Sequence, residues 1–295
     1  MTKTILITGA IGILGSNLIK ELSTKDDYKI LALDLNKDKL RTKFANYNNV
    51  FIIDESDLEN NKHKIDIIVN CGFARSKLGH ALISSINFAE KIFKFANNFQ
   101  IPKVINISSQ SVYGSYREIY SKETDELDPI DNYAIDKFTC EKLSTFYSTP
   151  LTQITNKRLA SLIGPEFDER IVTKLLNNAI RDNLISLSGG TQRFSFLDIR
   201  DAVSGLIALI ENSSKNWKNI YNLGTKENYT IIDLANYIAN FVNKACEGNV
   251  KISLSKSEIL QSILLDNSLF CNDFNWQPKF TIADSIRNIY ESKYC

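Results

Sequence analysis

The stretch KTILITGAIGILGSNLIKEL, residues 3–22, joins an apolar run to three regularly spaced glycines and then to a helix-like pattern. The run over 3–8 predicts a buried strand, and the apolar spacing over 12–24 predicts a helix. A glycine-rich turn between them is typical of a phosphate cradle, because the helix N-terminus presents free N–H groups and a partial positive charge. The alternative is a tight turn that uses glycine for steric reasons only, since this spacing alone is a weak signal.

Each glycine has a distinct role in such a cradle. Gly9 lets the chain turn sharply after the strand, Gly12 lets a diphosphate approach the backbone, and Gly15 lets the helix pack closely on the sheet. The turn therefore predicts a dinucleotide site.

An aspartate at the end of the second predicted strand supports this prediction. Asp34 follows the glycines by about 20 residues, where a carboxylate can bind the ribose hydroxyls of adenosine and repel a 2′-phosphate. The cofactor expected is NAD, although Lys37 and Lys39 leave NADP open. Asp34 also fits a capping role, and Asp54 at the third strand end fits either an adenine contact or a helix cap.

The rest of the first half alternates between apolar runs and stretches with helical spacing. The runs are rich in β-branched residues and leucine, which is typical of strands buried on both faces of a parallel sheet. Helices are predicted over 80–98 and 132–147. The alternation predicts an α/β fold with a Rossmann-type, doubly wound parallel sheet. Its further strands are predicted over 28–34, 50–54, 65–70, 103–108 and 152–159.

The pattern changes after residues 164–167. We expect a dinucleotide-binding Rossmann domain over 1–163 and a smaller, mostly helical substrate-binding cap over 164–295, with possible crossovers back to the sheet. A turn and an extended segment occupy 189–201. Helices of the second half are predicted over 170–182, 202–211, 230–242 and 281–292.

Composition excludes several classes of protein. Lys plus Arg total 35 and Asp plus Glu 34 in 295 residues, without a basic stripe, which disfavours a nucleic-acid partner. No apolar run approaches the roughly 20 residues of a membrane span, and Glu21 interrupts the N-terminal run before it resembles a signal peptide. Two scattered histidines and five cysteines without a CxxC pair predict no metal site and free thiols. We expect a cytoplasmic protein without a membrane partner.

Three side chains suggest proton transfer. Tyr133 and Lys137 lie four residues apart in a predicted helix, so they share one face. A phenol has an ordinary pKa of about 10, but a neighbouring ammonium stabilises the phenolate, which makes Tyr133 a candidate proton shuttle. Ser109, at a strand end, can donate a hydrogen bond to the reacting oxygen. Taken singly, these residues also fit an exposed helix face and a polar turn.

Ten short motifs follow one another along the chain. They are TGAIGILG (8–15), Asp34, DIIVNCG (66–72), Asn87, SSQSVYG (108–114), Tyr133 and Lys137 with Glu141, RLASLIGP (158–165), FLDIRDAV (196–203), YNLG (221–224) and NWQP (275–278). In this order they resemble the extended short-chain dehydrogenase/reductases, especially the NAD-dependent epimerase/dehydratase family, whose members modify nucleotide-sugars. The resemblance covers nearly the whole chain.

The resemblance implies roles for individual residues. Ser109 takes the place of the catalytic serine, Tyr133 that of the acid/base, and Lys137 that of the lysine that holds the nicotinamide ribose and lowers the tyrosine pKa. The implied cofactor contacts are Gly9, Gly12, Ile13, Leu14, Gly15, Asp34, Asp54, Cys71, Gly72, Tyr133 and Lys137. The implied substrate contacts are Ser109, Gln110, Ser111, Ser161 and Arg193.

Several positions depart from the family pattern. Dehydratases of this family carry an Asp-Glu pair just after the catalytic Ser or Thr, and Gln110 and Ser111 stand there instead, which disfavours dehydration by that route. Asp136 replaces the usual serine before Lys137, and Ser161 replaces an asparagine that often contacts the sugar diphosphate. Arg193 lies one residue earlier, relative to Asp201, than the phosphate-binding arginine of many epimerases.

The expected function is epimerisation of a nucleotide-sugar by bound NAD through a transient keto intermediate, in surface polysaccharide or deoxysugar biosynthesis. The alternative is an NAD(P)H-dependent 4-keto reductase of a nucleotide-linked deoxysugar. A minor alternative is a dinucleotide-binding regulator without catalysis. The resemblance also implies a homodimer formed through the helices over 80–98 and 132–147.

Overall fold

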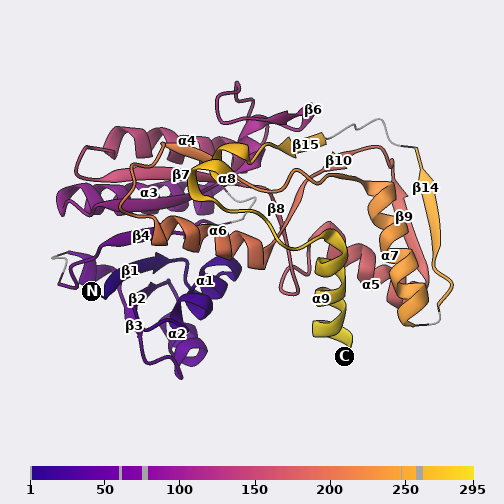
Figure 1. The fold of residues 1–295 in the computed structure, drawn as a ribbon, viewed down its shortest axis with the longest axis horizontal. Coiled ribbons are helices and arrows are strands. Elements are labelled where there is room, and N and C mark those ends of the chain that lie inside the picture. Colours follow the sequence, from indigo (N-terminus) through magenta and orange to yellow (C-terminus); the bar gives the residue numbers. More distant parts are fainter. Residues whose placement is uncertain (1, 60–61, 75–78, 247, 257–261) are drawn as a thin grey trace.

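A seven-stranded parallel sheet forms the centre of the structure, a computed structural model that describes residues 2–59, 62–74, 79–246, 248–256 and 262–295 (Figure 1). The strand order is β12-β7-β5-β4-β1-β2-β3, and each neighbouring pair is parallel. The chain runs outward in one direction from β1 and in the other from β4, so the order reverses between these two strands. In doubly wound sheets ligands bind at this point, outside the carboxyl ends of the strands.

The predicted strands and parallel sheet are confirmed. The structure adds β12, at the edge of the sheet, which the sequence marks only as part of the YNLG motif. The strands are β1 (Lys3–Thr8), β2 (Tyr28–Leu33), β3 (Val50–Ile53), β4 (Ile67–Asn70), β5 (Lys103–Ser109), β7 (Gln153–Leu159) and β12 (Ile220–Leu223).

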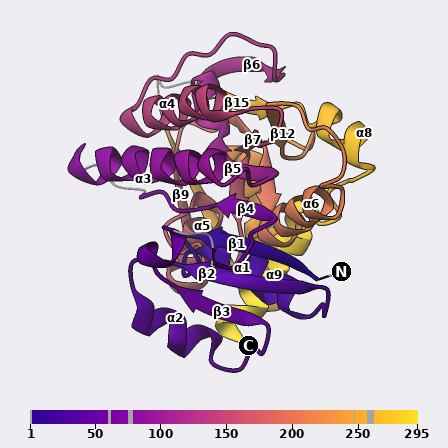
Figure 2. The ribbon, with the colours of Figure 1, turned by 90° about the vertical axis from the view of Figure 1, so that its left-hand side faces the viewer.

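Both faces of this sheet are buried. Ile5 and Ile7 of β1 belong to the core that includes α1 and α6, whereas Leu6 belongs to the core beneath α3 and α4. This alternation follows from the opposite directions of successive side chains in a strand and explains the continuous apolar runs. Figure 2 shows α3 and α6 on opposite sides of the sheet. The helices around it are α1 (Ile13–Ser23), α2 (Lys37–Phe44), α3 (Gly79–Asn98), α4 (Asn132–Tyr147), α6 (Ile199–Glu211) and α8 (Ser268–Phe274).

A separate core lies between the helices of the second half. Buried residues of α5, α7 and α9 pack together there, and β9 pairs in parallel with β14 beside them, on the right of Figure 1. These elements are α5 (Ile171–Asp182), α7 (Ile231–Ala245), α9 (Ile282–Tyr294), β9 (Leu184–Ser188) and β14 (Lys251–Ser255).

Short strands connect this region with the large sheet. One small sheet has the order β13-β10-β15-β6, and β8 pairs in parallel with β11. They are β6 (Tyr116–Ser121), β8 (Ser161–Ile163), β10 (Arg193–Phe194), β11 (Phe196–Asp198), β13 (Tyr229–Thr230) and β15 (Ser262–Leu265).

The chain returns to the large sheet after residue 163, since β12 pairs with β7 and α6 packs against the sheet. The division into domains over 1–163 and 164–295 stays a prediction. Arg75 and Lys77 follow the fourth strand in the sequence, where they fit either a substrate contact or a solvated loop, and both lie outside the described residues. Within the described ranges, no helix combines the length and the apolar character needed to cross a membrane.

Candidate active site

The turn after β1 can be built only with glycine at its first position. Gly9 has φ +62°, and a Cβ there would lie 2.7 Å from the backbone C of Cys71 and the N of Gly72. Gly72 in turn donates its N–H to the Thr8 hydroxyl over 3.2 Å. The ends of β1 and β4 are therefore in close backbone contact.

The Cys71 side chain is half-buried, and burial raises the pKa of its thiol to about 12.

The helix after this turn begins with an open N-terminus. Gly12 is the N-cap of α1 without a side-chain cap, and Ile13 and Leu14 are the first helical residues. A Cβ on Gly15 would lie 2.5 Å from the carbonyl O of Gly9, so only glycine permits this packing. The bare helix N-terminus fits a diphosphate, whose charge the helix dipole favours.

Two aspartates mark the ends of the next two strands. Asp34, after β2, accepts a hydrogen bond from the Ile11 N–H at 3.1 Å, so its carboxylate lies beside the glycine-rich turn. Asp54, after β3, accepts hydrogen bonds from the Ser56 and Asp57 N–H groups and caps the short helix over 55–58. It also pairs with Lys37, whose hydrogen bond lowers the pKa of the Asp54 carboxyl. Of the two roles expected for Asp54, the capping role is present.

The predicted Tyr133 and Lys137 lie on the first turns of α4. Asp131 caps this helix by accepting the Ala134 N–H at 2.7 Å. The Lys137 side chain is buried, with 4% exposure, and its Nζ lies 5.8 Å from the centroid of the Tyr133 ring. Burial lowers the pKa of Lys137 to about 8. The ammonium therefore still predominates at neutral pH, but its pKa is closer to neutrality than that of an exposed lysine.

The same lysine reaches the strand that carries the predicted serine. Lys137 Nζ donates a hydrogen bond to the Ile107 carbonyl at 2.7 Å. Ser109 ends β5 two residues later, and its Oγ accepts hydrogen bonds from the Ser111 N–H at 3.2 Å and the Ser111 hydroxyl at 2.9 Å. The N-terminal part of α4 is thus fixed to the carboxyl end of β5.

The predicted substrate contacts fall into two groups. Gln110 is buried, with 4% exposure, and its Nε2 donates to the Ser161 hydroxyl at 3.1 Å, whereas its Oε1 has no hydrogen-bond partner within the described part of the chain. Arg193 is exposed on β10, where its Nε donates to the Asn228 side chain at 2.8 Å. Among the residues the structure describes, no hydrogen bond joins Arg193 to Ser109, Gln110 or Ser161.

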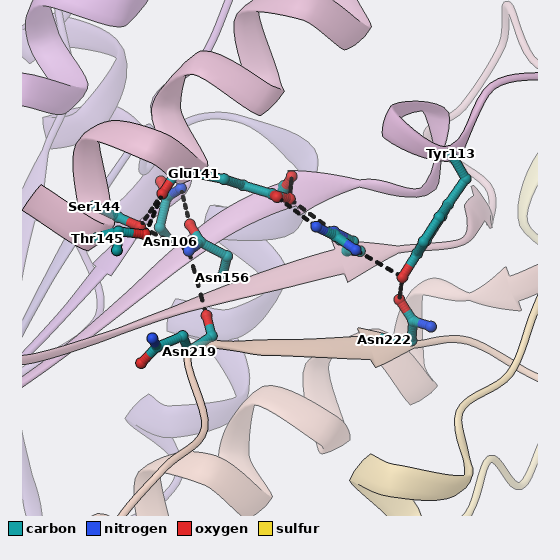
Figure 3. A network of polar contacts seen from close by, with 10 residues as sticks. Asn106, Tyr113, Glu141, Ser144, Thr145, Asn156, Asn219 and Asn222 are labelled. Carbon is teal, nitrogen blue, oxygen red and sulfur yellow. Dashed lines mark hydrogen bonds and ion pairs between the residues drawn. The ribbon is translucent and has the colours of Figure 1, made fainter. Parts of the chain in front are cut away.

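A buried ion pair fixes α4 to the sheet (Figure 3). Its two residues were identified from the sequence only as parts of longer motifs. Glu141 receives hydrogen bonds from Arg158 at 3.0 and 2.7 Å and from the Ser108 hydroxyl at 2.6 Å. Arg158 also donates to the Tyr113 hydroxyl at 2.8 Å, which donates to Asn222 at 2.8 Å. An arginine inside the buried run over 153–159 was the signal that could have revealed it, because such a charge needs a partner.

A row of polar side chains, also missed, crosses the sheet. Thr8, Asn70, Asn106 and Asn156 occupy matched positions on β1, β4, β5 and β7. Successive hydrogen bonds join them over 2.7, 3.0 and 2.8 Å. Asn156 also donates to Ser144 of α4 at 2.7 Å, and Figure 3 shows this end of the row from Asn106 onward. An asparagine recurs in three of the predicted strands, over 65–70, 103–108 and 152–159, and this repetition was the available signal.

Comparisons with known proteins agree with this architecture. Residues 5–224 match the NAD dependent epimerase/dehydratase family. The chain is 28% identical over 313 residues to an uncharacterised protein of Methanocaldococcus jannaschii, and the match covers 97% of this chain and 94% of that protein.

Two further similarities concern proteins with named activities. The trifunctional UDP-glucose 4,6-dehydratase/UDP-4-keto-6-deoxy-D-glucose 3,5-epimerase/UDP-4-keto-L-rhamnose-reductase of Arabidopsis thaliana is 26% identical over 312 residues, which cover 97% of this chain and 46% of that protein. UDP-glucuronic acid 4-epimerase from Bacillus cereus, solved with UDP-glucuronic acid and NAD, has a TM-score of 0.79 and 21% identity, with 98% of each chain covered. The expected family and fold class are confirmed, and NAD is confirmed as the cofactor of the family.

Proposed function

We propose a reaction for this chain from the premise that it belongs to the NAD-dependent epimerase/dehydratase family. The reaction is epimerisation of a nucleotide-sugar through a transient keto intermediate. The observation that carries the proposal is the pairing of Tyr133 with a buried Lys137 at the carboxyl end of β5, the edge of the sheet where the glycine-rich turn also lies. A proton-transfer group beside a dinucleotide cradle is what such a reaction requires.

The residues that would hold NAD lie around the ends of β1, β2 and β4. The N-terminus of α1, from Gly12 to Gly15, would bind the diphosphate, and Asp34 the adenosine ribose. Lys137 would bind the nicotinamide ribose. Bound NAD would supply an acceptor for a hydride from the sugar carbon and return that hydride later.

The protein's own residues would move the proton. The Lys137 ammonium stabilises the Tyr133 phenolate, which takes the proton of the hydroxyl on the reacting carbon. Ser109 donates a hydrogen bond to the same oxygen while the carbonyl forms. The keto sugar then presents its other face, and Tyr133 returns the proton to the oxygen. The cycle consumes no reducing equivalent, which suits a retained cofactor.

The residues after Ser109 favour epimerisation over dehydration. Elimination of water needs an acid near the leaving hydroxyl, and Gln110 and Ser111 offer an amide and a hydroxyl instead. A 4-keto reductase would use the same Tyr133 and Lys137, and the Arabidopsis relative includes a reductase among its three activities. Reduction is therefore the second candidate, and it differs in consuming NAD(P)H.

We also propose a cytoplasmic homodimer. All five cysteines are unpaired, as expected of a protein in a reducing compartment. Helices α3 and α4 pack side by side, and each exposes large apolar side chains, including Ile83 at 61%, Ile135 at 45% and Phe146 at 83% exposure. Two such faces can cover one another in a symmetric dimer.

The test is incubation of the purified protein with UDP-glucose, UDP-N-acetylglucosamine and UDP-glucuronic acid. We expect one of these sugars to be converted to its epimer, which NMR detects, without a net change in nicotinamide absorbance. Tyr133→Phe should lower kcat by at least about 100-fold, because it removes the proton shuttle. Stoichiometric oxidation of NADPH by a 4-keto sugar would replace the proposal with reduction, and failure to bind either coenzyme would overturn both.

A further inference from the structure

Phe73 makes contacts at the candidate site that no motif predicts. It follows the Cys71–Gly72 turn after β4 and is half-buried. Its ring meets the Tyr133 ring edge to face, with centroids 5.8 Å apart and an interplanar angle of 84°. The Lys137 Nζ lies 3.8 Å from the Phe73 centroid. One side chain therefore contacts both members of the proposed proton-transfer pair.

The importance of the contact between Phe73 and Lys137 depends on the other groups around the Lys137 ammonium. It donates a hydrogen bond to the Ile107 carbonyl, and the titratable groups that act on it are Cys140 and Glu141 on its own helix, Cys71 after β4, and Tyr133. Burial removes water, and the face of an aromatic ring attracts a cation more strongly once water is excluded. Phe73 lies nearer to Nζ than the Tyr133 ring does, at 3.8 against 5.8 Å.

We propose that Phe73 is a positioning residue, whose ring face holds the Lys137 ammonium beside Tyr133 and whose edge-to-face contact orients the phenol. This inference rests on the roles proposed for Tyr133 and Lys137. In this role Phe73 acts through these two side chains. Its effect is electrostatic as well as steric, because an aliphatic side chain of similar volume lacks the negative face of the ring.

The consequence is a coupled change in two ionisations. Without the ring, the charged form of Lys137 loses an attraction, so the pKa of the lysine falls. A less charged lysine stabilises the Tyr133 phenolate less, so the pKa of the tyrosine rises. The rising limb of the pH profile of kcat should then move to higher pH by up to about one unit. This is the pKa shift that corresponds to the energy of a buried cation–π contact.

The experiment compares aliphatic and aromatic replacements. Phe73→Leu and Phe73→Met remove the ring face, and Phe73→Tyr keeps it. Phe44→Leu is the matched control, because Phe44, the last residue of α2, forms a similar edge-to-face pair with Tyr47, at 5.7 Å and 71°. We expect both aliphatic variants to shift the pH profile of kcat, and Phe73→Tyr and Phe44→Leu to keep the wild-type profile.

A second readout does not require turnover. NMR of lysine Cε groups reports the pKa of Lys137 in the protein without cofactor, and the signal is assigned by its loss in Lys137→Arg. A lower lysine pKa in Phe73→Leu and Phe73→Met, with a wild-type value in Phe73→Tyr, supports the inference even if no sugar is epimerised. An unchanged lysine pKa in the aliphatic variants, or an equal shift in Phe73→Tyr, overturns it.

Discussion

At the scale of single residues, Lys157 is the least expected feature of the structure. It is completely buried on β7, and its Nζ has no hydrogen-bond partner within the described residues. It lies 3.7 Å from the centroid of Tyr221, with Phe270 and Phe274 within 6 Å on α8. Burial lowers the pKa of Lys157 well below its ordinary value, against the opposing charges of Glu123 and Asp273.

A methionine at this position should stabilise the protein. Because the lysine pKa is lower in the folded chain than in the unfolded chain, the unfolded chain binds more protons between the two values, and stability rises with pH there. We expect Lys157→Met to raise the free energy of unfolding near neutral pH by about 1–3 kcal/mol, the cost of an unsatisfied buried polar group. Urea unfolding at several pH values measures this.

The difference from the wild type should shrink as the pH approaches about 10, where the unfolded lysine also loses its proton. A gain that is independent of pH would point to packing alone. A loss of stability at neutral pH would show that the aromatic contacts outweigh the cost of burial.

At the scale of elements, local signals determined what could be predicted. The bounds of α4 agree with the predicted 132–147, because its apolar spacing is clear and Asp131 caps it. Helix α2 was missed, since only Leu40 and Phe44 of its eight residues are buried and a short polar stretch resembles a loop. The pairing of β9 with β14 joins segments far apart in the sequence, which periodicity cannot indicate.

The attachment of α4 should depend on its buried ion pair. Glu141→Gln keeps the side-chain size but leaves Arg158 buried without an opposite charge, since their side chains are only 4% and 2% exposed. We expect a loss of about 3–5 kcal/mol in the free energy of unfolding, measured by urea denaturation. Lys142→Gln, on the exposed side of the same helix, is the control and should change stability by less than about 0.5 kcal/mol. Equal effects of the two variants would contradict this role.

At the scale of the whole molecule, strand order decides which residues meet. Tyr133 and Lys137 could be predicted because one helix holds both, and Gly9 because its turn is local. The contact of Phe73 with Lys137 depends on how the end of β4 faces α4, and the row from Asn70 to Asn106 depends on strand register. Such contacts are fixed by tertiary packing, so spacing along the chain gives no indication of them.

The exposed apolar side chains of α3 and α4 allow the proposed dimer to be tested. Phe146, near the end of α4, is 83% exposed, although burying a phenylalanine is normally favourable by about 1.5–3 kcal/mol. If the faces of α3 and α4 form the dimer, Phe146→Asp places a charge in an apolar contact and should weaken association at least about 10-fold. Light scattering after size-exclusion chromatography across a dilution series measures the change.

Ile119 is the matched control, because it is 68% exposed and lies on β6, at the edge of the four-stranded sheet, instead of on α3 or α4. Ile119→Asp should leave the oligomeric state unchanged while Phe146→Asp yields monomers at the same concentration. The reverse pattern would move the interface to the edge strand β6, whose unpaired backbone groups offer another way to associate. If the wild-type protein is monomeric at every concentration, neither face forms an interface and the proposed dimer is wrong.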